Sequence, residues 1–140
     1  PGIGAMTALA FKAAIDDPKR FTASSKVGPY LGLTPRQYQS GESDRSGRIS
    51  RCGDSLARTL MYEAAVVILT RVKRASRLKD WALAIARRCG PGKARTALAR
   101  KLAVHSAQHM AVRRALQLEQ IGCHRLILHR ANRVRCFGAT

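Results

Sequence analysis

The chain has 140 residues, with 26 Lys and Arg against 8 Asp and Glu and a formal net charge of +18. This length supports one domain with a tail and excludes a multidomain assembly. The longest aliphatic run, Ala64–Leu69, is far shorter than the roughly 20 residues that cross a bilayer, so we expect no membrane partner.

The composition favours helices and a polyanionic partner. Hydrophobic residues make up 46% of the chain but aromatic residues only 5%, so the core must consist of Ala, Leu, Val and Ile, which suits packed helices. Nucleic acid is the expected partner, because each Lys or Arg laid on a phosphate releases a counterion. A solubilising basic surface and an anionic membrane are the two alternatives.

The cysteines predict the redox state of the thiols, and the first residue predicts that the chain is a fragment. Its four cysteines form no Cys-x-x-Cys pair and no secretory leader opens the sequence, so we expect reduced thiols in a cytoplasm. The sequence begins at Pro1, in the middle of a motif. We therefore expect a fragment, or the second half of a split gene.

The first part of the chain predicts two helices. The first ends at Asp16-Asp17-Pro18, because proline cannot continue a helix. A short second helix is expected from about Ser24 to Leu31, shortened or kinked at Pro29. The apolar residues that recur at helical spacing in the first helix are Ile3, Met6, Ala10, Ala13 and Ala14.

Residues 34–55 predict one long polar loop. Glycine and serine punctuate this segment, and a loop of this length within a compact domain is usually functional or disordered. The arginines in or beside it are Arg36, Arg45, Arg48, Arg51 and Arg58.

Three helices are expected after the loop, the first of them capped by Asp54 or Ser55. The first has an apolar stripe at Leu56, Leu60, Ala64, Val67, Ile68 and Val72. In the second of these helices, the residues expected to face the core are Leu78, Trp81, Ala84 and Ile85. Gly90-Pro91-Gly92 breaks the chain, and the third helix buries Ala94, Ala97, Leu98 and Leu102.

The pattern weakens after Val104, where a basic tail of residues 105–140 begins. The sequence therefore predicts an all-α domain over residues 1–104. It opens with a helix-hairpin-helix-like element, carries one long polar serine/arginine loop and ends in a poorly ordered basic tail.

Two glycines before the first helix form the first candidate binding site. Gly2 and Gly4 allow a tight turn, and the backbone N–H groups that follow face outward at the positive end of the helix dipole. This arrangement holds phosphate in helix-hairpin-helix modules. An ordinary helix entry is the alternative.

Ser40 is the candidate catalytic residue. It is followed by Gly41 and surrounded by arginines, whose guanidinium groups could hold the oxygens of a phosphodiester that a serine attacks. Residues 1–104 contain no histidine, so the base that activates this hydroxyl must come from elsewhere. A flexible basic loop that only touches the DNA backbone is the alternative.

The histidines after residue 104 do not predict a metal site. His105 and His109 lie one turn apart, a spacing that can hold a metal. The spacings of the cysteines and histidines downstream match no closed site, and the arginine-rich tail repels cations. We expect neither a metal nor a cofactor in this chain.

The chain resembles the C-terminal domain of the transposases of the insertion-sequence one-ten family, also called the one-sixteen or nine-oh-two type. The resemblance runs in order from residue 1 to about residue 104. The motifs that carry it are PGIG with Thr7-Ala8, Asp17 with Arg20-Phe21, YLGLTPR at 30–36, YQSGE at 38–42, GRIS at 47–50, CGD at 52–54, RTL at 58–60, YEAA at 62–65, KDWA at 79–82 and ARKLAV at 99–104.

The resemblance implies a bacterial, cytoplasmic and nucleoid-associated protein that cuts and rejoins DNA during transposition. Full-length members add an N-terminal RuvC-like domain whose acidic residues hold Mg²⁺, and a structured bridge RNA guides them. The serine of the family's Gln-Ser-Gly motif maps to Ser40 and implies a phosphoserine link to DNA. The implied partners are DNA, a guide RNA and full-length transposase as a homo-oligomer.

Two departures from the family pattern are expected to matter. The RuvC-like half is not in this sequence, so the chain alone should not cleave DNA. The family's closing helix is replaced after Val104, and we hypothesise that residues 105–140 are read out of frame, which translation of all three frames of the gene would test. The alternatives are a non-catalytic nucleic-acid-binding remnant and a translated pseudogene that never folds.

Overall fold

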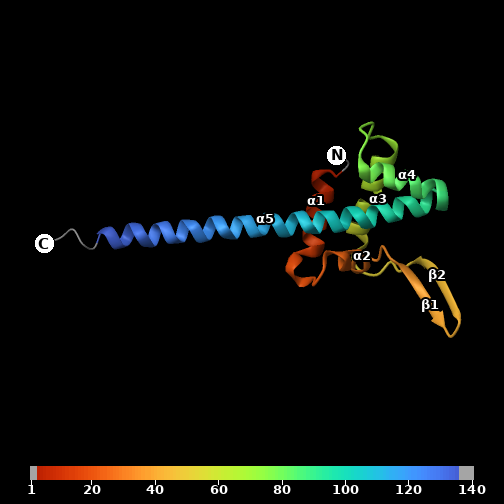
Figure 1. Cartoon of the computed structure of the whole chain (residues 1–140), viewed down its shortest axis with the longest axis horizontal. Helices are drawn as coiled ribbons and strands as arrows, with labels where there is room; N and C mark the ends of the chain where they lie inside the picture. The colour runs from red at the N-terminus through yellow and green to blue at the C-terminus, as the bar shows by residue number, and fades with distance from the viewer. Residues whose placement is uncertain (1–2, 136–140) are drawn as a thin grey trace. The chain divides into compact units, whose positions relative to one another are not determined.

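The computed structural model describes the backbone of residues 3–135, and the side chains of residues 3–42 and 44–113. It divides into two compact units, residues 1–108 and 109–140. In the described residues (Figure 1) the elements are α1 (Ala5–Ile15), η1 (Pro18–Arg20), η2 (Ser24–Lys26), α2 (Val27–Tyr30), β1 (Pro35–Ser40), β2 (Ser43–Ile49), α3 (Ser55–Thr70), α4 (Arg77–Cys89) and α5 (Pro91–Arg135).

The helices before the sheet begin and end close to the predicted positions. The helix α1 ends at Asp16, whose φ of 55° lies in the left-handed region, and Pro18 follows it. The carboxylate of Asp17 accepts a hydrogen bond from the backbone N–H of Lys19 at 2.9 Å. The predicted second helix is reduced to the short elements η2 and α2, with Pro29 inside α2.

The later helices are defined by local caps. The Asp54 carboxylate accepts a hydrogen bond from the N–H of Leu56 at 2.9 Å and starts α3, as predicted. The Ser76 hydroxyl accepts a hydrogen bond from the N–H of Lys79 and starts α4. Gly90, with a φ of 88°, ends α4, and α5 starts directly at Pro91.

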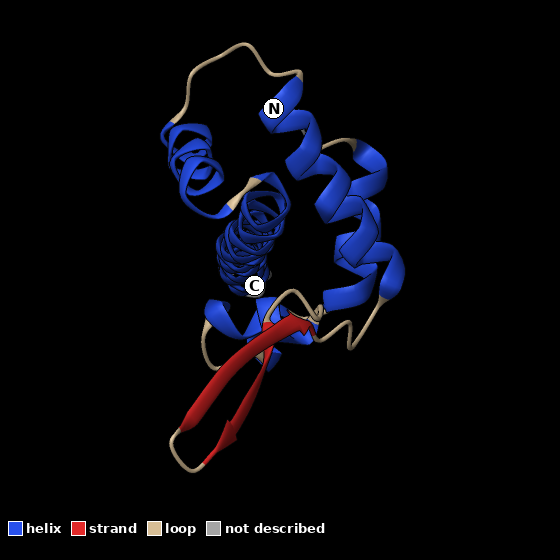
Figure 2. Ribbon diagram, turned by 90° about the vertical axis from the view of Figure 1, so that its right-hand side faces the viewer, coloured by secondary structure: helices blue, strands red, loops and turns tan. Residues whose placement is uncertain are grey.

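The core of the first unit is built around the first turns of α5. Figure 2 looks along this helix, with α4 on one side and α1 and α3 on the other. About half of the buried residues are alanines, and small side chains allow helices to approach closely. The buried residues are Phe11, Ile15, Val27, Leu31, Leu33, Ala57, Met61, Ala64, Ala65, Ile68, Ala82, Ala94, Leu98, Ala99, Leu102, Ala103 and Ala107.

The buried face of α3 agrees with the predicted stripe at Ala64 and Ile68 but lies one residue later in the first turns of the helix. Ala57 and Met61 are buried, whereas Leu56 is 60% exposed and Val67 is also exposed. Three of the five buried residues of α3 are alanines, so the buried face is richer in alanine than the predicted stripe. In α1 the buried residues are Phe11 and Ile15, while Met6 of the predicted set is exposed.

The all-α prediction is wrong for residues 35–49, where the predicted loop is an antiparallel β-hairpin. The strands β1 and β2 form this two-stranded sheet. Every residue of β1 is exposed, so no hydrophobic alternation marks the strand in the sequence. Cross-strand hydrogen bonds, rather than a buried face, define the hairpin.

The predicted basic tail is helical over residues 105–135, where α5 continues to Arg135. Residues 105–135 contain no proline and only one glycine, Gly122, and are rich in Ala, Leu, Gln and Arg, which favour helix. The predicted boundary after Val104 lies within α5, shortly before the end of the first unit. Among the described residues, no helix is long and apolar enough to span a membrane.

Candidate functional site

Ser40 lies at the tip of the β-hairpin. It is the last residue of β1 and pairs with Ser43, the first residue of β2. Gly41 and Glu42 form the two-residue turn between them, and Gly41 has a φ of 55°, which the first position of a type II′ turn requires. Ser40 is thus exposed at the end of an arm that extends away from the helices (Figures 1 and 2).

One face of the hairpin combines Ser40 with Tyr38 and Arg45. Tyr38 pairs with Arg45 across the ladder, two residues from the Ser40–Ser43 pair, so these side chains leave the sheet on the same side. A Cβ on Gly47 would lie 2.8 Å from Cε2 of Tyr38, so the tyrosine ring lies over this glycine. Arg45 is therefore the diagonal neighbour of Ser40, at about 7 Å between Cα atoms.

The Ser40 hydroxyl makes no hydrogen bond with the residues whose side chains the structure describes, which do not include its ladder partner Ser43. The Ser40 side chain is exposed, as are its neighbours Gln39 and Glu42. A hydroxyl in this position can approach a phosphodiester without any core rearrangement.

The predicted arginines are distributed along the hairpin and are not gathered around Ser40. The ladder is irregular between the Gln37–Ser46 and Pro35–Ile49 pairs, and this end carries Arg36 on β1 and Arg48 on β2. The Arg36 guanidinium donates a hydrogen bond to the carbonyl oxygen of Ser50 at 3.2 Å. Of the five arginines, the register brings Arg45 nearest to Ser40.

Arg58 stabilises the base of the hairpin. Its Nη1 donates to the carbonyl oxygens of Leu31 at 3.2 Å and Cys52 at 3.0 Å, joining the chain segments that enter and leave the hairpin. Backbone hydrogen bonds from Ser50 to Thr34 at 2.9 Å and from Arg51 to Gly32 at 3.2 Å join the same segments.

Two glycines make this close approach possible. Gly32 and Gly53 have φ values of 66° and 76°, and a Cβ on either would overlap the backbone of the opposite segment, at Cys52 and Tyr30 respectively. Arg51, the predicted clamp in this region, has a left-handed φ of 55°. The base of the hairpin is therefore tightly constrained, and the sequence analysis did not identify this constraint.

The predicted glycine site at the start of α1 is described in part. Gly4 is the N-cap of α1 and is exposed, with no atom within 4 Å of an added Cβ. Gly2 lies outside the described residues. A helix-hairpin-helix needs a helix on each side of the turn, and the described residues contain the one that follows it, so this motif stays a prediction.

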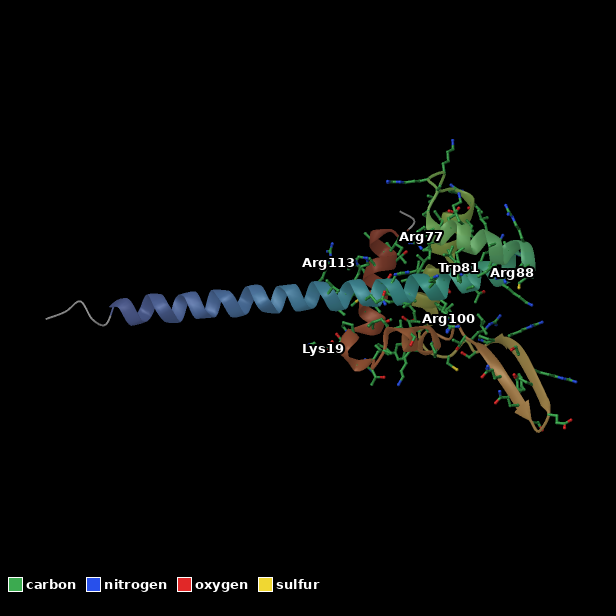
Figure 3. All side chains as sticks on the ribbon, viewed as in Figure 1. Lys19, Arg77, Trp81, Arg88, Arg100 and Arg113 are labelled. Atoms are coloured by element: carbon green, nitrogen blue, oxygen red, sulfur yellow. The ribbon has the colours of Figure 1, made fainter. Side chains whose placement is uncertain are left out.

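The sequence analysis also missed an exposed aromatic residue in a basic region. Trp81 was predicted to face the core but is 36% exposed, and Ala84 of the same predicted set is exposed too, while Ala82 is buried. The Lys101 ammonium of α5 lies 4.1 Å from the centroid of the Trp81 ring. Figure 3 shows Trp81 on α4 between Arg77 and Arg88. The described residues hold no cluster of three or more potential metal ligands.

The chain is similar to insertion-sequence transposases. It is 36% identical over 102 residues to the transposase for insertion sequence element IS1111A of Coxiella burnetii, covering 72% of this chain and 28% of that protein. It is 30% identical over 105 residues to a putative transposase, y4pF/y4sB, of Sinorhizobium fredii, covering 74% and 27%. A probable family 20 transposase of Pseudomonas aeruginosa is 37% identical over 68 residues, covering 49% and 20%.

The model of the Transposase IS116/IS110/IS902 family matches residues 1–81, which include the whole β-hairpin and α3. The chain belongs to this transposase family. It spans less than a third of the length of the relatives that it matches.

Proposed function

We propose that this chain is the C-terminal, serine-bearing part of an insertion-sequence transposase and that Ser40 is the nucleophile for cleavage and rejoining of DNA. The observation that carries the proposal is the exposed Ser40 hydroxyl at the tip of an arm with a constrained base. Family membership supports the same assignment.

The chemical step is a transesterification. The Ser40 oxygen forms a bond to phosphorus, and the bond from phosphorus to the leaving deoxyribose oxygen breaks. The leaving oxygen takes up a proton, and the serine proton passes to a base outside residues 1–104, which contain no histidine. Rejoining reverses the step. Mg²⁺ would be held by the RuvC-like half of the full-length protein, not by residues of this chain.

The arginines are assigned different roles by their position. Arg45, the diagonal neighbour of Ser40, would contact the oxygens of the attacked phosphate, where a guanidinium stabilises the added negative charge. Arg36, Arg48 and Arg51 would contact neighbouring phosphates. Arg58 is a positioning residue, because its guanidinium is already bonded to two backbone carbonyls.

We further propose that the partners are DNA, a structured guide RNA and full-length transposase in a homo-oligomer, in a bacterial cytoplasm near the nucleoid. The net charge of +18 supports binding to a polyanion. Gly2 and Gly4 would add a phosphate contact at the N-terminus of α1.

The test supplies the RuvC-like half as a separate polypeptide with Mg²⁺ and transposon-end DNA. We expect a covalent protein–DNA adduct on a denaturing gel, with DNA attached to the peptide that contains Ser40. The adduct should be lost in Ser40→Ala and retained in Ser46→Ala, the matched hairpin serine on β2. Absence of an adduct from the unmodified chain favours the alternative, a non-catalytic nucleic-acid-binding remnant.

A further inference from the structure

A row of exposed side chains follows one face of α4. Arg77, Trp81, Ala84 and Arg88 succeed each other at steps of four, three and four residues, which places them on the same side of a helix. All four are exposed, and Figure 3 labels three of them, Arg77, Trp81 and Arg88. The two arginines lie about 16 Å apart along the helix axis, with the indole between them. We call Arg77, Trp81 and Arg88, together with Lys101, the α4 face.

The charged residues around this face are almost all positive. Residues 71–101 contain eleven Lys and Arg and a single acidic residue, Asp80. Asp80 lies in the first turn of α4, where the positive end of the helix dipole favours a carboxylate. By comparison, the hairpin mixes its arginines with Glu42 and Asp44. The α4 face is therefore the more strongly basic of the two regions.

Trp81 is more exposed than its packing requires. Ala82 and Ala94 are fully buried and already join α4 and α5 to the core, whereas the Trp81 side chain keeps 36% of its surface exposed. The Lys101 ammonium lies 4.1 Å from the ring centroid, which is a cation–π contact. The ammonium lies over one face of the ring, so a stacked base would take the place of Lys101 on that face or use the other face.

We propose that the α4 face binds a single-stranded segment of nucleic acid, with a base stacked on Trp81 and flanking phosphates held by Arg77 and Arg88. Binding of unpaired strands combines cations that follow the backbone with an aromatic ring on which a base stacks. A duplex buries its base faces within its own stack and would use only the cations. An exposed indole between two arginines therefore favours an unpaired strand.

This inference rests on the proposed role in nucleic-acid binding but concerns a different surface from the Ser40 hairpin. The α4 face would hold a strand outside the reacting phosphate, so its variants should alter affinity without removing the serine. The two proposals can thus fail separately.

Trp81 is the only tryptophan in the chain, so intrinsic fluorescence reports on the α4 face alone. The full chain is titrated with unpaired DNA and RNA strands of equal length, with a duplex and with polyphosphate. We expect the unpaired strands to quench the fluorescence as they bind, and the DNA and RNA arms to show which strand is preferred. An equal quench by the duplex or by polyphosphate would overturn the stacking assignment, and so would binding without quenching.

Variants separate stacking from charge. Trp81→Ala should weaken binding of unpaired strands about tenfold, while Trp81→Phe, which keeps a ring, should weaken it much less. Arg77→Gln with Arg88→Gln should reduce the slope of log affinity against log salt by about 1.4, the value for two lost single-strand contacts. These two arginines are exposed, so this variant leaves the core intact.

The matched control removes two exposed charges elsewhere in the same unit, by Lys12→Gln with Lys19→Gln. If the control changes the slope as much as the arginine variant, net charge alone explains the binding and the proposal is wrong. If the α4 variants bind as the unmodified chain does while variants of the hairpin arginines Arg36, Arg45 and Arg48 bind weakly, this inference fails and the proposed function stands. If the variants of the hairpin arginines also bind normally, the assignment of these arginines to phosphate contacts fails as well.

Discussion

Gly53 is the residue on which the base of the hairpin most directly depends. Its φ of 76° is unfavourable for a side chain, and a Cβ would overlap the carbonyl oxygen of Tyr30. The left-handed conformation costs about 1–2 kcal/mol in any other residue, and the overlap with rigid backbone adds to this. We expect Gly53→Ala to lower the free energy of unfolding by at least about 2 kcal/mol, measured by urea denaturation.

Gly92 provides the control for this prediction. It lies in the first turn of α5 with open space around an added Cβ, so Gly92→Ala should raise the free energy of unfolding by about 0.5 kcal/mol. Opposite signs for the same substitution would show that backbone geometry decides the effect. A neutral Gly53→Ala would mean that the two segments at the hairpin base are not closely packed in solution.

At the scale of elements, the hairpin is expected to be dispensable for folding. All residues of β1 are exposed, and the buried residues nearest to the hairpin, Leu31 and Leu33, lie before it. Replacing residues 37–48 by a short glycine turn should therefore change the melting temperature by only about 4 °C or less, measured by circular dichroism. The same variant should lose the Ser40 adduct. A large loss of stability would show that the strands support the core.

How well each element could be predicted depends on how local its signal is. Asp54 and Gly90 act within their own helix ends, so the start of α3 and the end of α4 follow from the sequence. The hairpin has no buried face and hence no apolar alternation to detect. The role of Arg58 could not be predicted, because it depends on a carbonyl oxygen 27 residues earlier in the chain. Trp81 was assigned to the core from its apolar spacing alone. This spacing does not show which side of α4 is covered by a neighbouring helix.

At the scale of the whole chain, stability should reside in the first unit. Among the residues whose side chains are described, every buried one lies at or before Ala107, and Gln108 donates a hydrogen bond to the Ser24 hydroxyl at 3.2 Å. The residues after the first unit, 109–140, form a separate compact unit. A chain ending at Val112 should therefore unfold cooperatively at nearly the melting temperature of the full chain.

A shorter truncation, ending at Leu98, provides the comparison for the chain ending at Val112. Ending the chain at Leu98 removes four buried residues of α5, Ala99, Leu102, Ala103 and Ala107, and with them part of the core. This shorter chain should lack a cooperative transition in circular dichroism, whereas the chain ending at Val112 should lose helical signal only in proportion to the residues removed. Should the Val112 variant melt more than about 5 °C below the full chain, residues 113–140 would have to contribute to the stability of the first unit.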